Sequence, residues 1–356
     1  MSQRPMLESL TGLRFFAALL IFFHHAWGYT QYPSLLPIWP SFEADHVAVG
    51  FFFMLSGFVL TWSSVADTPK VVLIGRRIAR VYPLHLLALA FAVVVLTTTQ
   101  KQVEWIATPA SFVLLQAWFP DPIRYAINGP AWSISAELFF YLLFPFIVAS
   151  LIRIRRWKIA LTIIVLLMVV IAAGAWLLAP DAADFLAYTF PPFRIGEFLI
   201  GILLAAAMRR GWRHRIRVPI AVGVALVGLS IFTALVTVLG DVIPRGTFVV
   251  ASIPSEALLI TSAAQADLSG RRGFLGSRAL IALGNWSFAF YLLHLSVLIA
   301  LRPYAHGPVT TVVVLSIALV VTMLMSAGVH HWFERPVERR IRGWVENRWG
   351  AVRPSS

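Results

Sequence analysis

Arg14 and His25 stand out for chemistry because both lie in an almost entirely apolar stretch, 10–29. Eleven helical residues turn through about 1100°, so the two side chains share one face about 16 Å apart. A guanidinium binds phosphate or carboxylate, and an imidazole accepts protons near neutral pH. One extended ligand would therefore contact both. In the structural alternative, Arg14 reaches lipid headgroups and His25 bonds a backbone carbonyl.

Glu137 is a carboxylate inside another apolar stretch, 131–152. If the stretches alternate in direction, Glu137 lies at a depth comparable with that of His25, where it would orient or charge-stabilise the imidazole. Its alternative partner is an arginine. Arg194 and Glu197, three residues apart at a similar depth, predict a structural ion pair.

Tyr291 and His294 lie three residues apart in the stretch 279–301 and so share one helix face. We predict that both belong to the site. His24 is rotated by about 100° from His25, so the two imidazoles do not converge on one small target. We interpret His24 as structural.

A cluster of three arginines, Arg76, Arg77 and Arg80, precedes the apolar stretch 84–100. Guanidinium forks arranged within one or two turns suit phosphate groups. Lipid headgroups and membrane topology demand the same residues, and the sequence favours neither reading.

Several chemistries have no signature in the sequence. The chain contains no cysteine, so it offers no thiolate nucleophile or thiolate metal ligand. It also lacks a His-Glu-x-x-His motif, a phosphate-binding P-loop and a dinucleotide fingerprint. We therefore predict no metal site and no permanently bound cofactor.

The elements that must position these residues are membrane helices. Of 356 residues, 59% are hydrophobic and only 13% are charged, and the mean hydropathy is +0.80. Apolar stretches long enough to span a bilayer predict an all-α, polytopic transmembrane bundle of about ten helices. They cover 10–29, 46–65, 84–100, 131–152, 159–179, 193–208, 218–239, 247–264, 279–301 and 309–333.

The net charge of +13 marks topology rather than a nucleic-acid partner, because the chain has no hydrophilic domain to carry a binding face. Of the 29 Lys and Arg residues, 23 fall in one set of alternate connections and 4 in the other. The positive-inside rule then predicts that both termini are cytoplasmic. We expect a membrane-embedded domain over 1–335, a basic cytoplasmic tail over 336–356, and a location in the inner (plasma) membrane.

Taken together, these residues resemble the acyltransferase-3 family of integral membrane acyltransferases, which O-acylate sugars, bacterial surface polysaccharides and some macrolides. The resemblance covers essentially the whole chain. It rests on seven blocks in the family's order: Leu10 to Arg14 with ten residues before His25, Phe53 to Phe58, Arg76 to Pro83, Trp132-Ser133 with Glu137 and Tyr141, Arg194 with Glu197, Tyr291 with His294, and Glu334 to Pro336.

The resemblance implies that Arg14 and His25 are essential, that His25 is the catalytic group, and that an acyl-CoA, most often acetyl-CoA, is the donor. The chain differs from the family's pattern at Phe290-Tyr291 and at His85, so His85 receives no role. The resulting expectation for the site assigns catalysis to His25 and Glu137, donor binding to Arg14, Arg76, Arg77 and Arg80, and substrate binding to Trp132, Tyr291 and His294.

The spacing of Arg14 and His25 fits this activity, because about 16 Å is of the same order as the pantetheine arm of acyl-CoA. Inner guanidiniums would hold the phosphates while His25 takes the proton of an acceptor hydroxyl on a glycan or macrolide. Membrane lipids are the remaining expected partner.

Two other classes compete with this reading. Intramembrane Arg, His and Glu are also typical of secondary transporters and flippases, although the sequence shows neither inverted repeats nor paired broken helices. The third class is a polytopic sensor or scaffold, in which a basic tail recruits a partner. Only the enzyme would put label from an acyl-CoA onto a hydroxyl acceptor.

Overall fold

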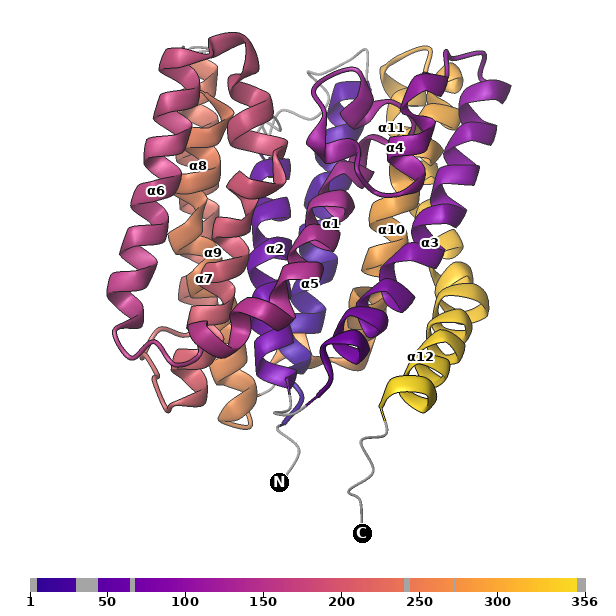
Figure 1. Cartoon of the computed structure of the whole chain (residues 1–356). Helices are drawn as coiled ribbons and strands as arrows, with labels where there is room; N and C mark the ends of the chain where they lie inside the picture. Colours follow the sequence, from indigo (N-terminus) through magenta and orange to yellow (C-terminus); the bar gives the residue numbers. More distant parts are fainter. Residues whose placement is uncertain (1–4, 30–43, 65–67, 240–243, 272, 351–356) are drawn as a thin grey trace.

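The structure of the chain, a computed structural model, describes residues 5–29, 44–64, 68–239, 244–271 and 273–350. Helices make up most of this part of the chain (Figure 1). Their bounds are α1 Glu8–Tyr29, α2 Ala44–Ser63, α3 Lys70–Thr98, α4 Thr108–Phe112, α5 Trp132–Leu151, α6 Trp157–Leu178, α7 Pro191–Arg209, α8 Val218–Leu239, α9 Arg245–Leu268, α10 Arg278–Leu301, α11 Pro308–Val329 and α12 Arg335–Trp349.

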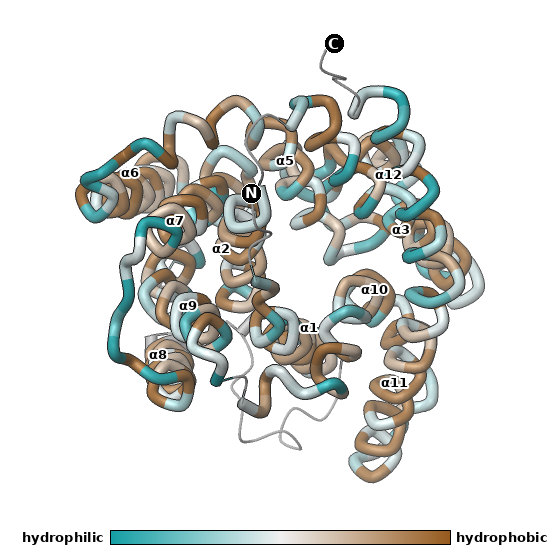
Figure 2. The backbone as a smooth tube through the Cα atoms, turned by 90° about the horizontal axis from the view of Figure 1, so that it is seen from below, coloured by the Kyte–Doolittle hydropathy of each residue, from teal (hydrophilic) through white to brown (hydrophobic). Residues whose placement is uncertain are grey.

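Ten helical segments within the described ranges are long and apolar enough to cross a membrane. This confirms the predicted all-α transmembrane bundle. The helices run up and down, and α1 begins at the same end of the bundle at which α12 lies (Figure 1). We call this the basic end, because its connections carry clusters such as Arg153, Arg155 and Arg156. Viewed from there, hydrophilic residues concentrate in the connections and in α12 (Figure 2).

The third span is longer than predicted. α3 begins at Lys70, so the three arginines lie within the helix and not ahead of it, and Pro83 lies in its interior. A proline removes one backbone hydrogen bond from a helix but is tolerated where tertiary packing holds both halves. Such packing is present, because α12 lies along α3 with Val345 seated on Gly75.

The segment predicted as a basic tail is partly helical and docked. Residues 335–349 form α12, and residues 351–356 lie outside the described part of the chain. Arg76 pairs with Glu346 at 2.8 Å and Arg80 with Glu338 at 4.0 Å, which fixes α12 to α3.

α2 and α7 pack closely against each other. A Cβ atom on Gly57 would clash with the backbone of Phe198, and one on Gly201 would clash with the backbone of Met54. Reciprocal glycines of this kind let two helix backbones approach closely. This close approach holds α2 beside the elements that carry the site.

The long connection between α3 and α5 is folded onto the end of the bundle opposite the basic end. It contains α4 and short 3₁₀ turns. His85 of α3, fully buried, bonds through Nε2 to the Ser111 carbonyl at 2.7 Å, and Ser135 of α5 donates to the Leu114 carbonyl at 2.6 Å. His85 thus anchors this connection.

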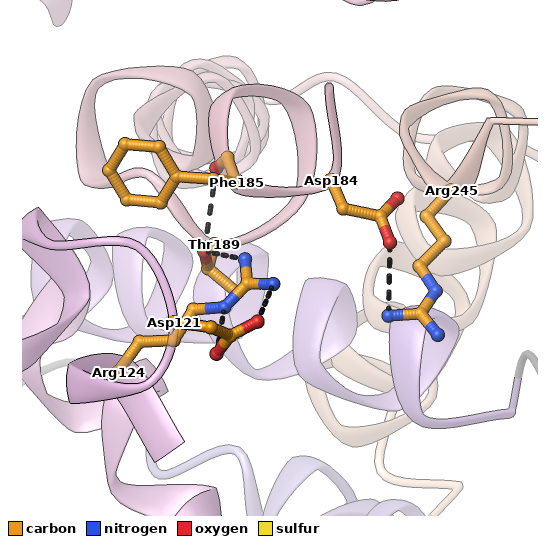
Figure 3. Close-up of polar contacts among 6 residues, drawn as sticks. All are labelled: Asp121, Arg124, Asp184, Phe185, Thr189 and Arg245. Atoms are coloured by element: carbon orange, nitrogen blue, oxygen red, sulfur yellow. Dashed lines mark hydrogen bonds and ion pairs between the residues drawn. The ribbon is translucent and has the colours of Figure 1, made fainter. Parts of the chain in front are cut away.

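Two arginines tie the same end together (Figure 3). Arg124 donates to both carboxylate oxygens of Asp121, at 2.9 and 2.7 Å, and to Thr189 Oγ1 at 3.0 Å. Thr189 closes a π-helical turn, Phe185–Thr189, just before α7. Arg245 at the start of α9 pairs with Asp184 at 3.3 Å. These contacts join the α3–α5 connection, α7 and α9 into one cap.

Candidate active site

A cavity of about 180 Å³ lies among α1, α2, α3, α5 and α10. Three arginines line it: Arg14 from α1 and Arg77 and Arg80 from α3. Arg77 and Arg80 reach it together because residues three apart share a helix face. With Glu137 as the carboxylate among its lining residues, the cavity carries an excess of positive charge. It is therefore suited to a polyanion.

Glu137 lies inside this cavity and not beside the imidazole that it was predicted to orient. Its Oε1 accepts hydrogen bonds from the hydroxyls of Ser56 and Tyr141. Arg77 lies over the ring of Tyr141, 6.0 Å from its centroid. The reason is helical geometry, since Tyr141 follows Glu137 by one turn on α5 and both face α2. The hydrogen-bond partners of Glu137 in the described part of the chain are Ser56 and Tyr141, not His25, and they organise the arginine cavity.

Arg76, predicted to bind donor with Arg77 and Arg80, does not line the cavity. It is rotated by about 100° from Arg77 on α3. Its Nε donates to Glu346 of α12 at 2.8 Å. In this structure Arg76 is a structural residue, whereas Arg80 lines the cavity and also lies 4.0 Å from Glu338.

His25 and His294 meet between α1 and α10. His25 Nδ1 lies 2.9 Å from the Ile21 carbonyl and 3.3 Å from His294 Nε2, and His294 Nδ1 lies 2.7 Å from the Tyr291 carbonyl. A carbonyl only accepts, so both Nδ1 atoms carry a proton. His294 Nε2 then accepts from His25 Nδ1, and Nε2 of the neutral His25 is a proton acceptor. The pairing of these histidines was not predicted, although both were assigned to the site.

Tyr291 connects the histidine pair to the cavity. It lines the cavity together with Ser133, and its hydroxyl bonds Ser133 Oγ at 2.7 Å and the Pro130 carbonyl at 2.8 Å. His294 follows Tyr291 by three residues, and their ring centroids are 6.0 Å apart. Tyr291 therefore lies between the cavity that the three arginines line and the histidine pair, and neither His25 nor His294 lines that cavity.

Residues 7–331 match the model of the acyltransferase-3 family, which is described as an acyltransferase domain. The chain belongs to this family. It is therefore an acyltransferase, and its ten apolar helices make it a multi-pass membrane protein.

Relatives of this acyltransferase carry names of the same kind. Acyltransferase MdmB of Streptomyces mycarofaciens is 35% identical over 82% of this chain and 79% of its own length. O-acetyltransferase OatA of Staphylococcus aureus is 24% identical over 94% of this chain but only 57% of its own. Nodulation protein 10 of Rhizobium leguminosarum is 28% identical over 47% of this chain and 49% of its own. No solved structure matches the chain.

Trp132 of this acyltransferase, predicted to bind substrate, lies in the core and does not line the cavity. Its ring packs against Tyr188 and Phe53, with centroid separations of 5.1 and 6.2 Å. The Arg194 guanidinium lies 5.8 Å from the same ring. Trp132 therefore covers a buried cation, which explains its place at the start of α5.

The predicted ion pair of Arg194 and Glu197 is confirmed, at 2.9 Å with both side chains fully buried. The sequence analysis missed Glu256 of α9, which is also fully buried. Its Oε2 atom has no hydrogen-bond partner among the described residues. A Cβ atom on Gly50 would touch the carboxylates of both Glu197 and Glu256, so the two acids lie close together. Glu256 could have been found in the sequence as an acidic residue inside an apolar span.

Proposed function

We propose that this acyltransferase transfers an acyl group, most simply acetyl, from acyl-CoA to a hydroxyl of a sugar, surface polysaccharide or macrolide-type acceptor. The observation that carries the proposal is that Arg14, Arg77 and Arg80 line one cavity, and that Tyr291, which lines the same cavity, lies beside His294 of the histidine pair. The relatives named acyltransferase and O-acetyltransferase support the class of reaction.

The three arginines are proposed to bind the phosphates of the donor. Guanidinium groups pair with phosphate through two parallel hydrogen bonds, and such pairs strengthen where water is excluded. The cavity lies among helices of the bundle, and most of the chain's cationic residues lie in the connections at the basic end of that bundle. An elongated donor would enter from this end and extend its pantetheine arm along α1.

His25 is proposed as the general base. Its Nε2 would accept the proton of the acceptor hydroxyl as the oxygen attacks the thioester carbonyl. The new C–O bond replaces the C–S bond, and the departing CoA thiolate takes the proton from His25. His294 would hold the imidazole in the required tautomer through the contact at 3.3 Å.

Glu137 is proposed to act by positioning. Its carboxylate accepts hydrogen bonds from Ser56 and Tyr141, and Arg77 lies over the Tyr141 ring. Glu137 would thereby fix the position of the cavity wall against which the donor lies. This positioning role replaces the predicted direct action of Glu137 on the imidazole.

The site is proposed to work in the plasma membrane with the basic end in the cytoplasm, which is where acyl-CoA is made.

The direct test incubates the purified protein with radiolabelled acetyl-CoA and a panel of hydroxylated glycans and macrolides. Label on an acceptor in the wild type and none in His25→Ala supports the proposal. Uptake of labelled acceptor into vesicles with no covalent product would instead identify a transporter. Mass spectrometry of surface glycans and secreted metabolites from a deletion strain would name the acceptor and the acyl group together.

A further inference from the structure

A second, larger hollow lies on the other side of α1 from the arginine cavity. This lateral groove, of about 1660 Å³, runs between α1 and the pair α8 and α9. Leu13 faces the groove, whereas its neighbour Arg14 faces the cavity. The groove therefore belongs to neither the donor route nor the histidine pair.

Most of the groove wall is apolar and regular. α8 contributes Val222, Ala225, Leu226 and Leu229, whose spacing places them along one helix face. On α1 the wall extends from Ser9 to Trp27, a length of about 27 Å. One leaflet accounts for about half of a hydrocarbon core of about 30 Å, so an acyl chain of one leaflet fits within this length.

The groove is not apolar at its basic end. Arg215, Arg217 and Arg271 line it there, all three exposed, and none has an ion-pair partner among the described residues. The nearby carboxylate of Asp267 is occupied, because it accepts from the backbone amide and the hydroxyl of Ser9 at 2.8 and 2.6 Å. Three guanidiniums at one mouth are suited to an anionic partner.

The connection that presents two of these arginines is anchored. His214 lies directly before Arg215, its backbone amide donates to Gln265 Oε1 at 2.9 Å, and its Nε2 donates to Thr261 Oγ1 at 3.0 Å. Both partners belong to α9, which forms a wall of the groove. The arginines are thus held at the mouth by the same helix that lines the groove.

We propose that the lateral groove binds an anionic phospholipid of the leaflet at the basic end. Its phosphate lies on Arg215, Arg217 and Arg271, and its acyl chains lie against α1 and α8. A soluble anion would leave the apolar walls uncovered, and a second apolar helix would leave three arginines without counter-charge. A lipid with a negative headgroup satisfies both ends of the groove.

The first test measures binding of phosphatidylglycerol and phosphatidylcholine to delipidated protein by native mass spectrometry. Each arginine near a lipid headgroup contributes about fivefold to binding, so Arg215→Ala with Arg217→Ala should weaken phosphatidylglycerol binding about thirtyfold. The control, Arg155→Ala with Arg156→Ala, removes two exposed arginines at the same end that do not line the groove. It should leave binding unchanged.

The second test fills the groove without touching a charge. Ala225→Trp places an indole in the groove, whereas Val227→Trp, at a side chain that is 59% exposed and outside the groove, does not. Loss of phosphatidylglycerol binding in the first variant and its retention in the second supports the site, provided that both unfold at the wild-type temperature without lipid. Equal binding by groove and control variants, or equal affinity for phosphatidylcholine, overturns the proposal. The assay follows lipid alone, so its outcome is independent of acyl transfer.

Discussion

At the scale of single residues, backbone carbonyls determine which ring nitrogen of His25 and of His294 carries the proton. One carbonyl lies a turn back from His25 and the other three residues back from His294, at 2.9 and 2.7 Å, so each Nδ1 must donate. Each carbonyl belongs to the helix that carries the histidine, so the local backbone selects the tautomer. The pair thus supplies a fixed proton acceptor inside a membrane, where a charged imidazole would be costly.

Replacement of His25 by alanine tests this directly. We expect acyl transfer to fall by about 10² to 10⁴, which is the usual contribution of a general base. Thermal unfolding should change little, because the Ile21 carbonyl belongs to the same helix as His25 and the side chain is only half-buried. Retention of more than about a tenth of the activity would rule out the general-base role.

Arg14 and Arg76 form a matched pair for donor binding, since both are arginines near the basic end but only Arg14 lines the cavity. Arg14→Lys keeps the charge but loses the bidentate fork, so the KM for acyl-CoA should rise while kcat survives in part. Arg76→Lys should leave the KM nearly unchanged. Equal effects of the two substitutions on the KM would contradict the assignment of the donor to this cavity.

The residues of the site were largely predictable, but their partners were not. Hydropathy singles out Arg14, His25, Glu137 and His294 because polar groups are costly in a bilayer. It says nothing of rotation between helices, and rotation decides that Glu137 faces Ser56 while His25 faces His294. The same limit applies to Trp132, whose motif position indicated substrate but whose ring covers Arg194.

At the scale of elements, the connection 210–217 is held by one neutral histidine. The Ile216 amide donates to His214 Nδ1 at 3.1 Å, so the ring proton is on Nε2, where it bonds Thr261. Burial lowers the pKa of His214 below its usual value. Protonation of Nδ1 would break the bond to Ile216.

This network predicts a pH-dependent loss of stability. Because the folded pKa of His214 is depressed, its contribution is complete above the unfolded pKa of about 6.5 and is lost as pH falls through the lower folded value. We expect the thermal unfolding temperature of the wild type to fall more between about pH 6.5 and 5 than that of His214→Gln. Parallel pH profiles of the two proteins would exclude His214 as the responsible group.

Helix spans were predictable because the bilayer fixes their length and composition. Two elements escaped. α3 begins at Lys70, 14 residues before its apolar stretch, and α12 carries too many charged residues to be found as an apolar span. Each is stabilised by the other, through Val345 on Gly75 and the pairs of Arg76 and Arg80 with α12 glutamates. The signal that could have found α12 is its helical periodicity, because Val337, Ile341, Trp344 and Val345 share one helix face.

At the scale of the whole molecule, the two ends of the bundle differ in charge, and donor access should follow this difference. In vesicles with oriented protein, we expect acyl-CoA to support transfer only from the side that carries α12. A polyanion is attracted by the field of the basic connections, and Arg14, Arg77 and Arg80 lie in the first halves of α1 and α3, which begin at that end. Transfer with acyl-CoA supplied only from the opposite side would overturn the proposed route along α1.

α1 separates two hollows of opposite character, and this arrangement determines how the helix tolerates change. Arg14, Ala18 and His25 face the cavity or α10, while Leu13, Ala17 and His24 face the groove, one residue out of phase. In a saturation mutagenesis scan of α1, the sensitive positions should therefore form two patterns. Each pattern has a period of about 3.6 residues, and the two are offset by one position. Turnover would follow the first, and dependence on lipid composition would follow the second. A single helix would in this way report on chemistry and on membrane environment as separable signals.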